Sequence, residues 1–173
     1  MQSAFFSVIS VFSVLNPLNF SEGKMSDTTR DRVLIADDNE ANVELLEAYL
    51  ADSELDVEIA VAVDGQDTME KATSFKPHLI LLDVMMPKLS GFEVCQKLKG
   101  DPATSGIMIL MVTALNEHGD MERAVDAGTD DFLSKPVDKV SLVKRVENML
   151  KLRTVSDELE RLRRYIEQME AER

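Results

Sequence analysis

Short apolar runs alternate with longer amphipathic stretches along this 173-residue chain. Such runs mark four predicted strands at 33–36, 57–62, 79–83 and 107–112, and a fifth predicted strand lies within 130–134. The amphipathic stretches lie at 42–52, 66–75, 91–99, 117–127 and from 139 onward. Short unbroken runs predict buried strands, and apolar residues three and four positions apart predict helices. Strands that alternate with helices form a parallel sheet covered on both faces. The sequence therefore predicts an α/β fold, doubly wound around a five-stranded parallel sheet.

The third apolar run, 79–82, is followed directly by a carboxylate, Asp83. Burying an ionised acid without a partner is costly, so we expect Asp83 at the point where the strand leaves the sheet. Ligands of open parallel sheets bind outside the carboxyl ends of the strands. The residues that follow the other predicted strands at this edge are Asp37, Asp38, Thr113, Ala114 and Lys135. The sequence therefore predicts a polar site at one edge of the sheet.

Three carboxylates at one edge repel each other, by roughly 4 kcal/mol for two unit charges ~4 Å apart at an effective dielectric constant of about 20. Lys135 supplies one positive charge, and a divalent cation would supply two more. The two histidines, His78 and His118, are expected to be surface residues rather than ligands. Carboxylates without nearby His or Cys suit Mg²⁺. The residue types therefore suit Mg²⁺-assisted phosphoryl transfer onto Asp83, which would form an aspartyl phosphate.

Four motifs resemble the receiver domain of bacterial two-component response regulators. They are "VLIADDNE" (33–40), "LILLDVMMPKLSGFEV" (79–94), "MVTA" (111–114) and "DFLSKP" (131–136). The resemblance covers a receiver domain at 31–151 and implies a flavodoxin-like sheet with strand order 2-1-3-4-5. It implies a phosphoaccepting signalling protein rather than an enzyme, with only Mg²⁺-dependent self-phosphorylation and dephosphorylation. The phosphoryl group would come from a sensor histidine kinase or a phosphotransfer protein.

The resemblance also implies a role for each acidic residue. Asp83 would be the phosphoacceptor. Asp38 would bind Mg²⁺ directly, and Asp37 mostly through water. The backbone carbonyl of Met85 and the carboxylate of Asp83 would complete the protein ligands.

Four further residues would contact the phosphoryl group or respond to it. Lys135, Thr113 and Ala114 lie at the positions that contact it, and Phe132 matches the aromatic switch position. Phosphorylation adds charge and acceptor oxygens, which would draw Thr113 inward. The Phe132 ring would then turn into the vacated space. The surface formed by the fourth helix, fifth strand and fifth helix would change, and a downstream protein would bind it differently in the two states.

Two other classes of protein share part of this pattern. Haloacid dehalogenase-type hydrolases also use an aspartyl nucleophile and magnesium, but they carry Asp-x-Asp after the first strand, where this chain has Asp37-Asp38. A coiled-coil adaptor with an inert receiver is the second alternative. The intact set of acids, Thr113 and Lys135 argues against it.

The beginning of the chain is expected to lie outside the domain. Residues 4–15 are apolar, but they are too short for a comfortable membrane span and no Lys or Arg precedes them. Met25 opens a plausible natural start. We therefore expect residues 1–30 to be a non-domain segment, disordered or the product of an upstream start, and we expect no membrane association.

Charge and cysteine content indicate which partners and which cellular compartment suit the domain. The net charge is −13, and residues 1–24 and 151–173 each sum to zero, so the whole acidic excess lies in 25–150. Such a surface argues against direct nucleic-acid binding. The single cysteine, Cys95, excludes an intrachain disulfide and fits a cytoplasmic protein.

The fifth predicted helix has no stop signal, because neither Gly nor Pro occurs from Lys139 to Arg173. After a phase break near 149–155, its apolar residues follow steps of three and four that are typical of a coiled-coil seam. These residues are Leu152, Val155, Leu159, Leu162, Ile166 and Met169. Three interpretations of the extension 152–173 stay open: a parallel homodimer, docking on the domain or on a partner, and a connector to an output domain.

Overall fold

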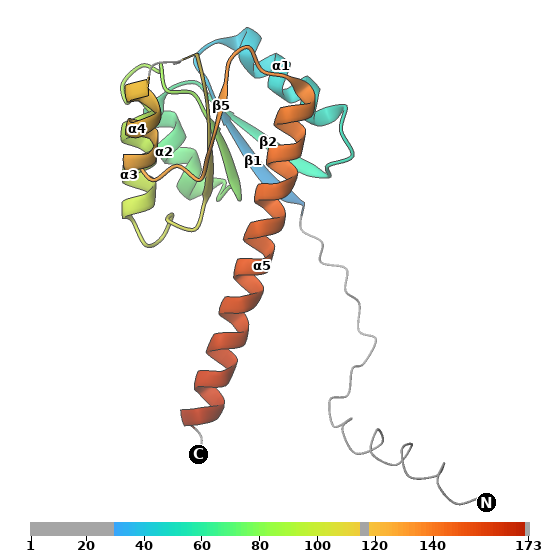
Figure 1. The fold of residues 1–173 in the computed structure, drawn as a ribbon, viewed down its shortest axis with the longest axis vertical. Coiled ribbons are helices and arrows are strands. Elements are labelled where there is room, and N and C mark those ends of the chain that lie inside the picture. Colours follow the sequence, from blue (N-terminus) through green and yellow to red (C-terminus); the bar gives the residue numbers. More distant parts are fainter. Residues whose placement is uncertain (1–29, 115–117, 172–173) are drawn as a thin grey trace, which may run out of the picture.

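The computed structural model describes residues 30–114 and 118–171, apart from the side chains of 118–121. Its five strands form one parallel sheet in the order β2-β1-β3-β4-β5 (Figure 1). The strands are β1 (Asp31–Ala36), β2 (Val57–Ala62), β3 (Leu79–Leu82), β4 (Met108–Thr113) and β5 (Asp131–Ser134). The predicted fold class and strand order are confirmed. The expectation for residues 1–29 lies outside the described residues.

Five helices connect and follow the strands. They are α1 (Glu40–Ala51), α2 (Gly65–Ser74), α3 (Gly91–Gly100), α4 (His118–Asp126) and α5 (Lys139–Ala171). Polar side chains mark several of their starts: Asn39 accepts backbone N–H groups at the start of α1, Asp64 does so for α2, and Ser90 and Glu93 form a capping box on α3. Asp138 accepts the N–H of Ser141 in the first turn of α5. The capped helix starts therefore hold in place the loops that follow the strands, and these loops carry the polar residues at the carboxyl edge of the sheet.

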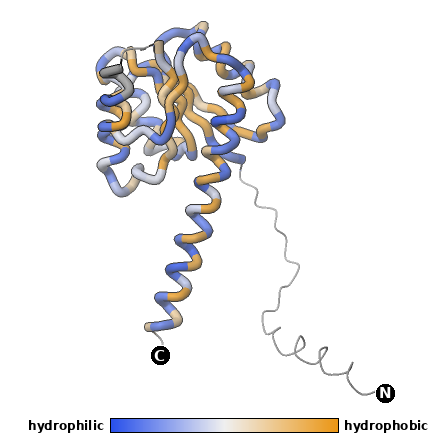
Figure 2. Tube along the Cα trace, viewed as in Figure 1, coloured by the Kyte–Doolittle hydropathy of each residue, from blue (hydrophilic) through white to orange (hydrophobic). Residues whose placement is uncertain are grey.

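Alternate residues of each central strand enter two separate cores. On β1, Leu34 faces the core shared with α2 and α3, whereas Val33 and Ile35 face the core shared with α1 and α5. All four residues of β3 are buried. Burial on both faces explains why the strands appear in the sequence as unbroken apolar runs, and Figure 2 shows them as the hydrophobic centre of the domain.

The fifth helix runs without interruption to Ala171 and projects beyond the domain (Figure 1). Its first part covers the sheet through Leu142, Val146 and Met149, all of them buried. The predicted long C-terminal helix is therefore confirmed.

The expectation that His78 is a plain surface residue is wrong. Its ring is largely buried at the start of β3, and Nδ1 lies 2.8 Å from Oδ1 of Asp31. Arg153 of α5 lies 3.3 Å from the same Asp31 oxygen. His78 therefore belongs to a polar cluster at the edge opposite Asp83. His118 opens α4, and its side chain lies outside the described residues.

Gly91 opens α3 directly against the segment that carries Asp83. A Cβ there would lie 2.2 Å from the Asp83 carbonyl oxygen and 2.9 Å from Cα of Val84. Because backbone atoms cannot rotate away, Gly91→Ala should lower the free energy of unfolding by about 1–3 kcal/mol. Gly100→Ala, where an added Cβ meets nothing within 4 Å, should be neutral or raise it by up to about 1 kcal/mol. Urea unfolding measures both, and equal losses would contradict this account.

Burial lowers the pKa of His78, and the hydrogen bond to Asp31 offsets this only in part. The unfolded chain therefore protonates this histidine at a higher pH than the folded protein does. The resulting stability is present above the unfolded pKa of about 6.5 and declines as the pH falls below it. His78→Gln should remove this component. Thermal unfolding of both proteins over the mildly acidic range measures the effect, and identical pH profiles would contradict it.

Candidate functional site

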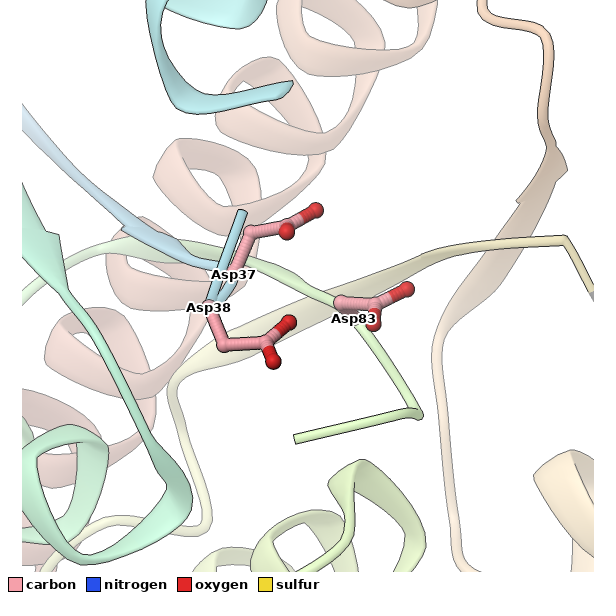
Figure 3. A group of neighbouring side chains, drawn as sticks. All are labelled: Asp37, Asp38 and Asp83. Carbon is pink, nitrogen blue, oxygen red and sulfur yellow. The ribbon is translucent and has the colours of Figure 1, made fainter. Parts of the chain in front are cut away.

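Three carboxylates meet at the carboxyl edge of the sheet. Asp37 and Asp38 follow β1, and Asp83 follows β3; one oxygen from each lies within 4.8 Å of the others (Figure 3). The pairing of Ala36 with Leu82 brings the two strand ends side by side. Asp37 and Asp83 are buried, whereas Asp38 is exposed. The cluster therefore has a closed side and an open side.

Lys135, directly after β5, bridges the two buried acids. Its Nζ lies 2.6 Å from Oδ2 of Asp37 and 3.0 Å from Oδ1 of Asp83. Burial alone would lower the pKa of Lys135, but the hydrogen bonds to both aspartates outweigh it, so its pKa is raised. Its ammonium group therefore stays charged and partly neutralises the pair.

The charge of Asp83 is only partly compensated. Burial raises the pKa of Asp83, Lys135 lowers it through a hydrogen bond and its charge, and the neighbouring Asp37 raises it again. The balance is a raised pKa. The backbone N–H of Met85 also donates to Oδ2 of Asp83, at 3.0 Å. The site therefore favours a further positive charge near Asp83.

Asp37 accepts more hydrogen bonds than the sequence predicted. The side-chain amide of Asn42 donates to both of its oxygens, at 3.1 and 3.0 Å, and the N–H of Asn39 donates to Oδ1 at 2.9 Å. With Lys135, these donors surround the carboxylate. Neither asparagine was among the predicted site residues. The only sequence feature that could have indicated them is the helix-capping position of Asn39, directly after the acidic pair.

The remaining predicted residues lie around this cluster. Strand β4 ends one position later than expected, so Thr113 is its last residue, and Thr113 is buried. Its carbonyl accepts the N–H of Lys135 at 2.8 Å. Ala114 follows and is exposed, as is Met85 beyond Asp83. Phe132 on β5 is half-buried against the core under α3 and pairs with Met111 in the sheet register.

The donor set fits Mg²⁺. All three clustered side chains offer carboxylate oxygen; two of them follow β1, and the third follows the neighbouring strand β3. The site has one exposed acid for direct contact and one acid, Asp37, whose oxygens already accept hydrogen bonds. Oxygen ligands with room for several waters are what Mg²⁺ prefers.

Comparison with known proteins identifies the class. Residues 33–147 match the response regulator receiver domain family. Among curated proteins, the response regulator PleD of Caulobacter vibrioides is 45% identical over 128 residues, which cover 74% of this chain and 28% of PleD. The transcriptional regulator RpaA of Synechocystis is 41% identical over 120 residues, 69% of this chain and 49% of RpaA. This chain thus spans half or less of either relative.

Solved structures show the same fold. The signal receiver domain of a histidine kinase from Syntrophus aciditrophicus aligns with a TM-score of 0.63 and 30% identity, covering 70% of this chain and 90% of that one. A CheY-like receiver domain from Methanospirillum hungatei aligns with a TM-score of 0.66 and 24% identity, over 74% and 99% of the two chains. This chain belongs to the response regulator receiver domain family, whose members act in two-component signalling. Within residues 30–114 and 118–171, no helix is long and apolar enough to cross a membrane.

Mg²⁺ should raise the melting temperature of the chain, because a ligand that binds only the folded state stabilises it. Asp38→Asn should remove most of that shift. Because Asp38 is exposed, the stability without metal should change by no more than about 0.5 kcal/mol. Asp56→Asn, an exposed aspartate at the opposite edge of the sheet, serves as the matched control and should respond like the unmodified chain. A full Mg²⁺ response in Asp38→Asn would contradict the assignment.

Proposed function

We propose that Asp83 accepts a phosphoryl group from a phosphohistidine of a sensor kinase or phosphotransfer protein. A carboxylate oxygen of Asp83 forms the new bond to phosphorus, while the bond from phosphorus to the donor's imidazole nitrogen breaks. The observation that carries this proposal is the bridge of Lys135 between Asp37 and Asp83, with the exposed Asp38 beside them. That arrangement is a charged pocket open on one side.

Each residue of the pocket has a separate task in this proposal. Asp38, Asp83 and the carbonyl of Met85 would hold Mg²⁺, and Asp37 would hold its water. When bound, the metal supplies positive charge that offsets the charge of the transferring group. Lys135 would move from the carboxylate pair towards a phosphoryl oxygen. Thr113 and the N–H of Ala114 would contact the remaining phosphoryl oxygens.

The change in the site would reach the surface through β4 and β5. The N–H of Lys135 donates a hydrogen bond to the carbonyl of Thr113, so a shift of one strand end would be passed to the other. Drawing Thr113 towards the phosphoryl group would open space for the half-buried ring of Phe132. The surface of α4, β5 and α5 would then exist in two forms, which a partner can distinguish.

The chain would act in the cytoplasm as a receiver domain (31–151) with a helical extension (152–173). Its partners would be the phosphodonor and a downstream protein, or a second copy joined through the extension. The acidic excess of 25–150 argues against direct binding of nucleic acid by this domain.

Incubation with a small phosphodonor and Mg²⁺ should add one phosphate, detected as an acid-stable and base-labile mass increase of the intact protein. The added mass should be absent in Asp83→Asn and after chelation of Mg²⁺, because both the acceptor and the metal are needed. Asp126→Asn, an exposed aspartate on α4, is the matched control and should be modified normally. Modification of Asp83→Asn to the same extent would refute the assignment.

A further inference from the structure

Helix α5 has two apolar faces that follow one another along its length. In its first part Leu142, Val146, Met149 and Leu150 are buried against the sheet. In its projecting part the apolar residues spaced three and four positions apart are all more than half exposed. They are Leu152 (62%), Val155 (54%), Leu159 (57%), Leu162 (58%), Ile166 (54%) and Met169 (53%), here called the seam. The phase break in the sequence is where the apolar stripe passes from one face to the other.

The orientation of the seam is fixed by Arg153. This side chain lies 3.3 Å from Oδ1 of Asp31 on β1 and 2.8 Å from Oδ2 of Asp157 on α5. At 100° per residue, Arg153 and Asp157 lie on the side of the helix opposite the seam. Because Arg153 is tied to the sheet, the seam faces away from the domain that carries it. A second helix therefore has room to approach.

The seam cannot be covered by its own receiver domain in this arrangement, because the helix projects beyond it (Figure 1). Hydrophobic segments recur along the projecting part of α5 in Figure 2. Helices in proteins take most of their stability from contacts of an apolar face rather than from propensity. A continuous exposed apolar stripe of this kind marks an interaction surface.

We propose that the seam pairs with the seam of a second copy in a parallel, in-register, two-stranded coiled coil. With Leu152 at heptad position a, Glu158 falls at g and Arg163 at e. Parallel pairing sets g of one helix against e of the other. Glu158 then lies opposite Arg163 of the second copy, and two-fold symmetry forms this attractive pair twice. The other g–e pairs in the described residues, Lys151 with Ser156 and Tyr165 with Glu170, bring no like charges together. This pairing does not depend on the phosphoacceptor role of Asp83.

Sedimentation equilibrium of the full chain tests the seam itself. The unmodified chain should form a concentration-dependent dimer. Leu162→Gln should weaken it at least about tenfold, because two buried leucines leave the seam. Arg161→Gln, one residue away and outside the seam, should leave the dimer unchanged. A chain that stays monomeric, or a dimer that Leu162→Gln does not weaken, would overturn the proposal.

Charge reversal tests the parallel register. Glu158→Arg and Arg163→Glu should each weaken the dimer, because like charges then face each other, and the double variant should restore it. Failure of the double variant to recover would overturn the parallel register. Phosphorylation of Asp83 in the same variants is the independent readout. It should persist in all of them, so a failed dimer and a failed phosphoacceptor give different results.

Discussion

The ammonium of Lys135 is the contact on which the site depends. It joins Asp37 and Asp83, two buried acids on neighbouring strands, and it comes from a third strand at the edge of the sheet. Two carboxylates at this separation would otherwise destabilise the fold by several kcal/mol. The parallel sheet in this strand order brings the three strand ends to one edge. The fold thus supports a concentration of negative charge that Lys135 balances only in part.

That partial balance links structure to signalling. A site that is short of positive charge suits a bound metal, and under the proposed function a phosphoryl group on Asp83 would change how Lys135 and Thr113 are held. A backbone hydrogen bond joins Thr113 and Lys135. Phe132 lies on β5, the strand that leads into Lys135. A local change of charge can therefore shift the equilibrium of a surface on β5 and α5 without any large rearrangement of the two cores.

Much of this arrangement could be predicted from the sequence, and the misses have one cause. The apolar runs predicted the strands within a residue or two because burial on both faces excludes polar residues. Asp83 could be predicted as a site residue because a carboxylate ends such a run. Asn42 could not, since its contact with Asp37 exists only after the first turn of α1 has folded. The contact between Asp31 and Arg153 spans 122 positions, and no local pattern indicates it.

The central claim is that one aspartate out of three clustered acids receives the phosphoryl group. Borohydride reduction of the phosphorylated protein converts an acyl phosphate to homoserine, and tandem mass spectrometry of its peptides then locates the modified position. The account predicts homoserine at position 83 alone, with Asp37 and Asp38 recovered unchanged. Homoserine at position 37 or 38, or at a residue outside the cluster, would contradict it.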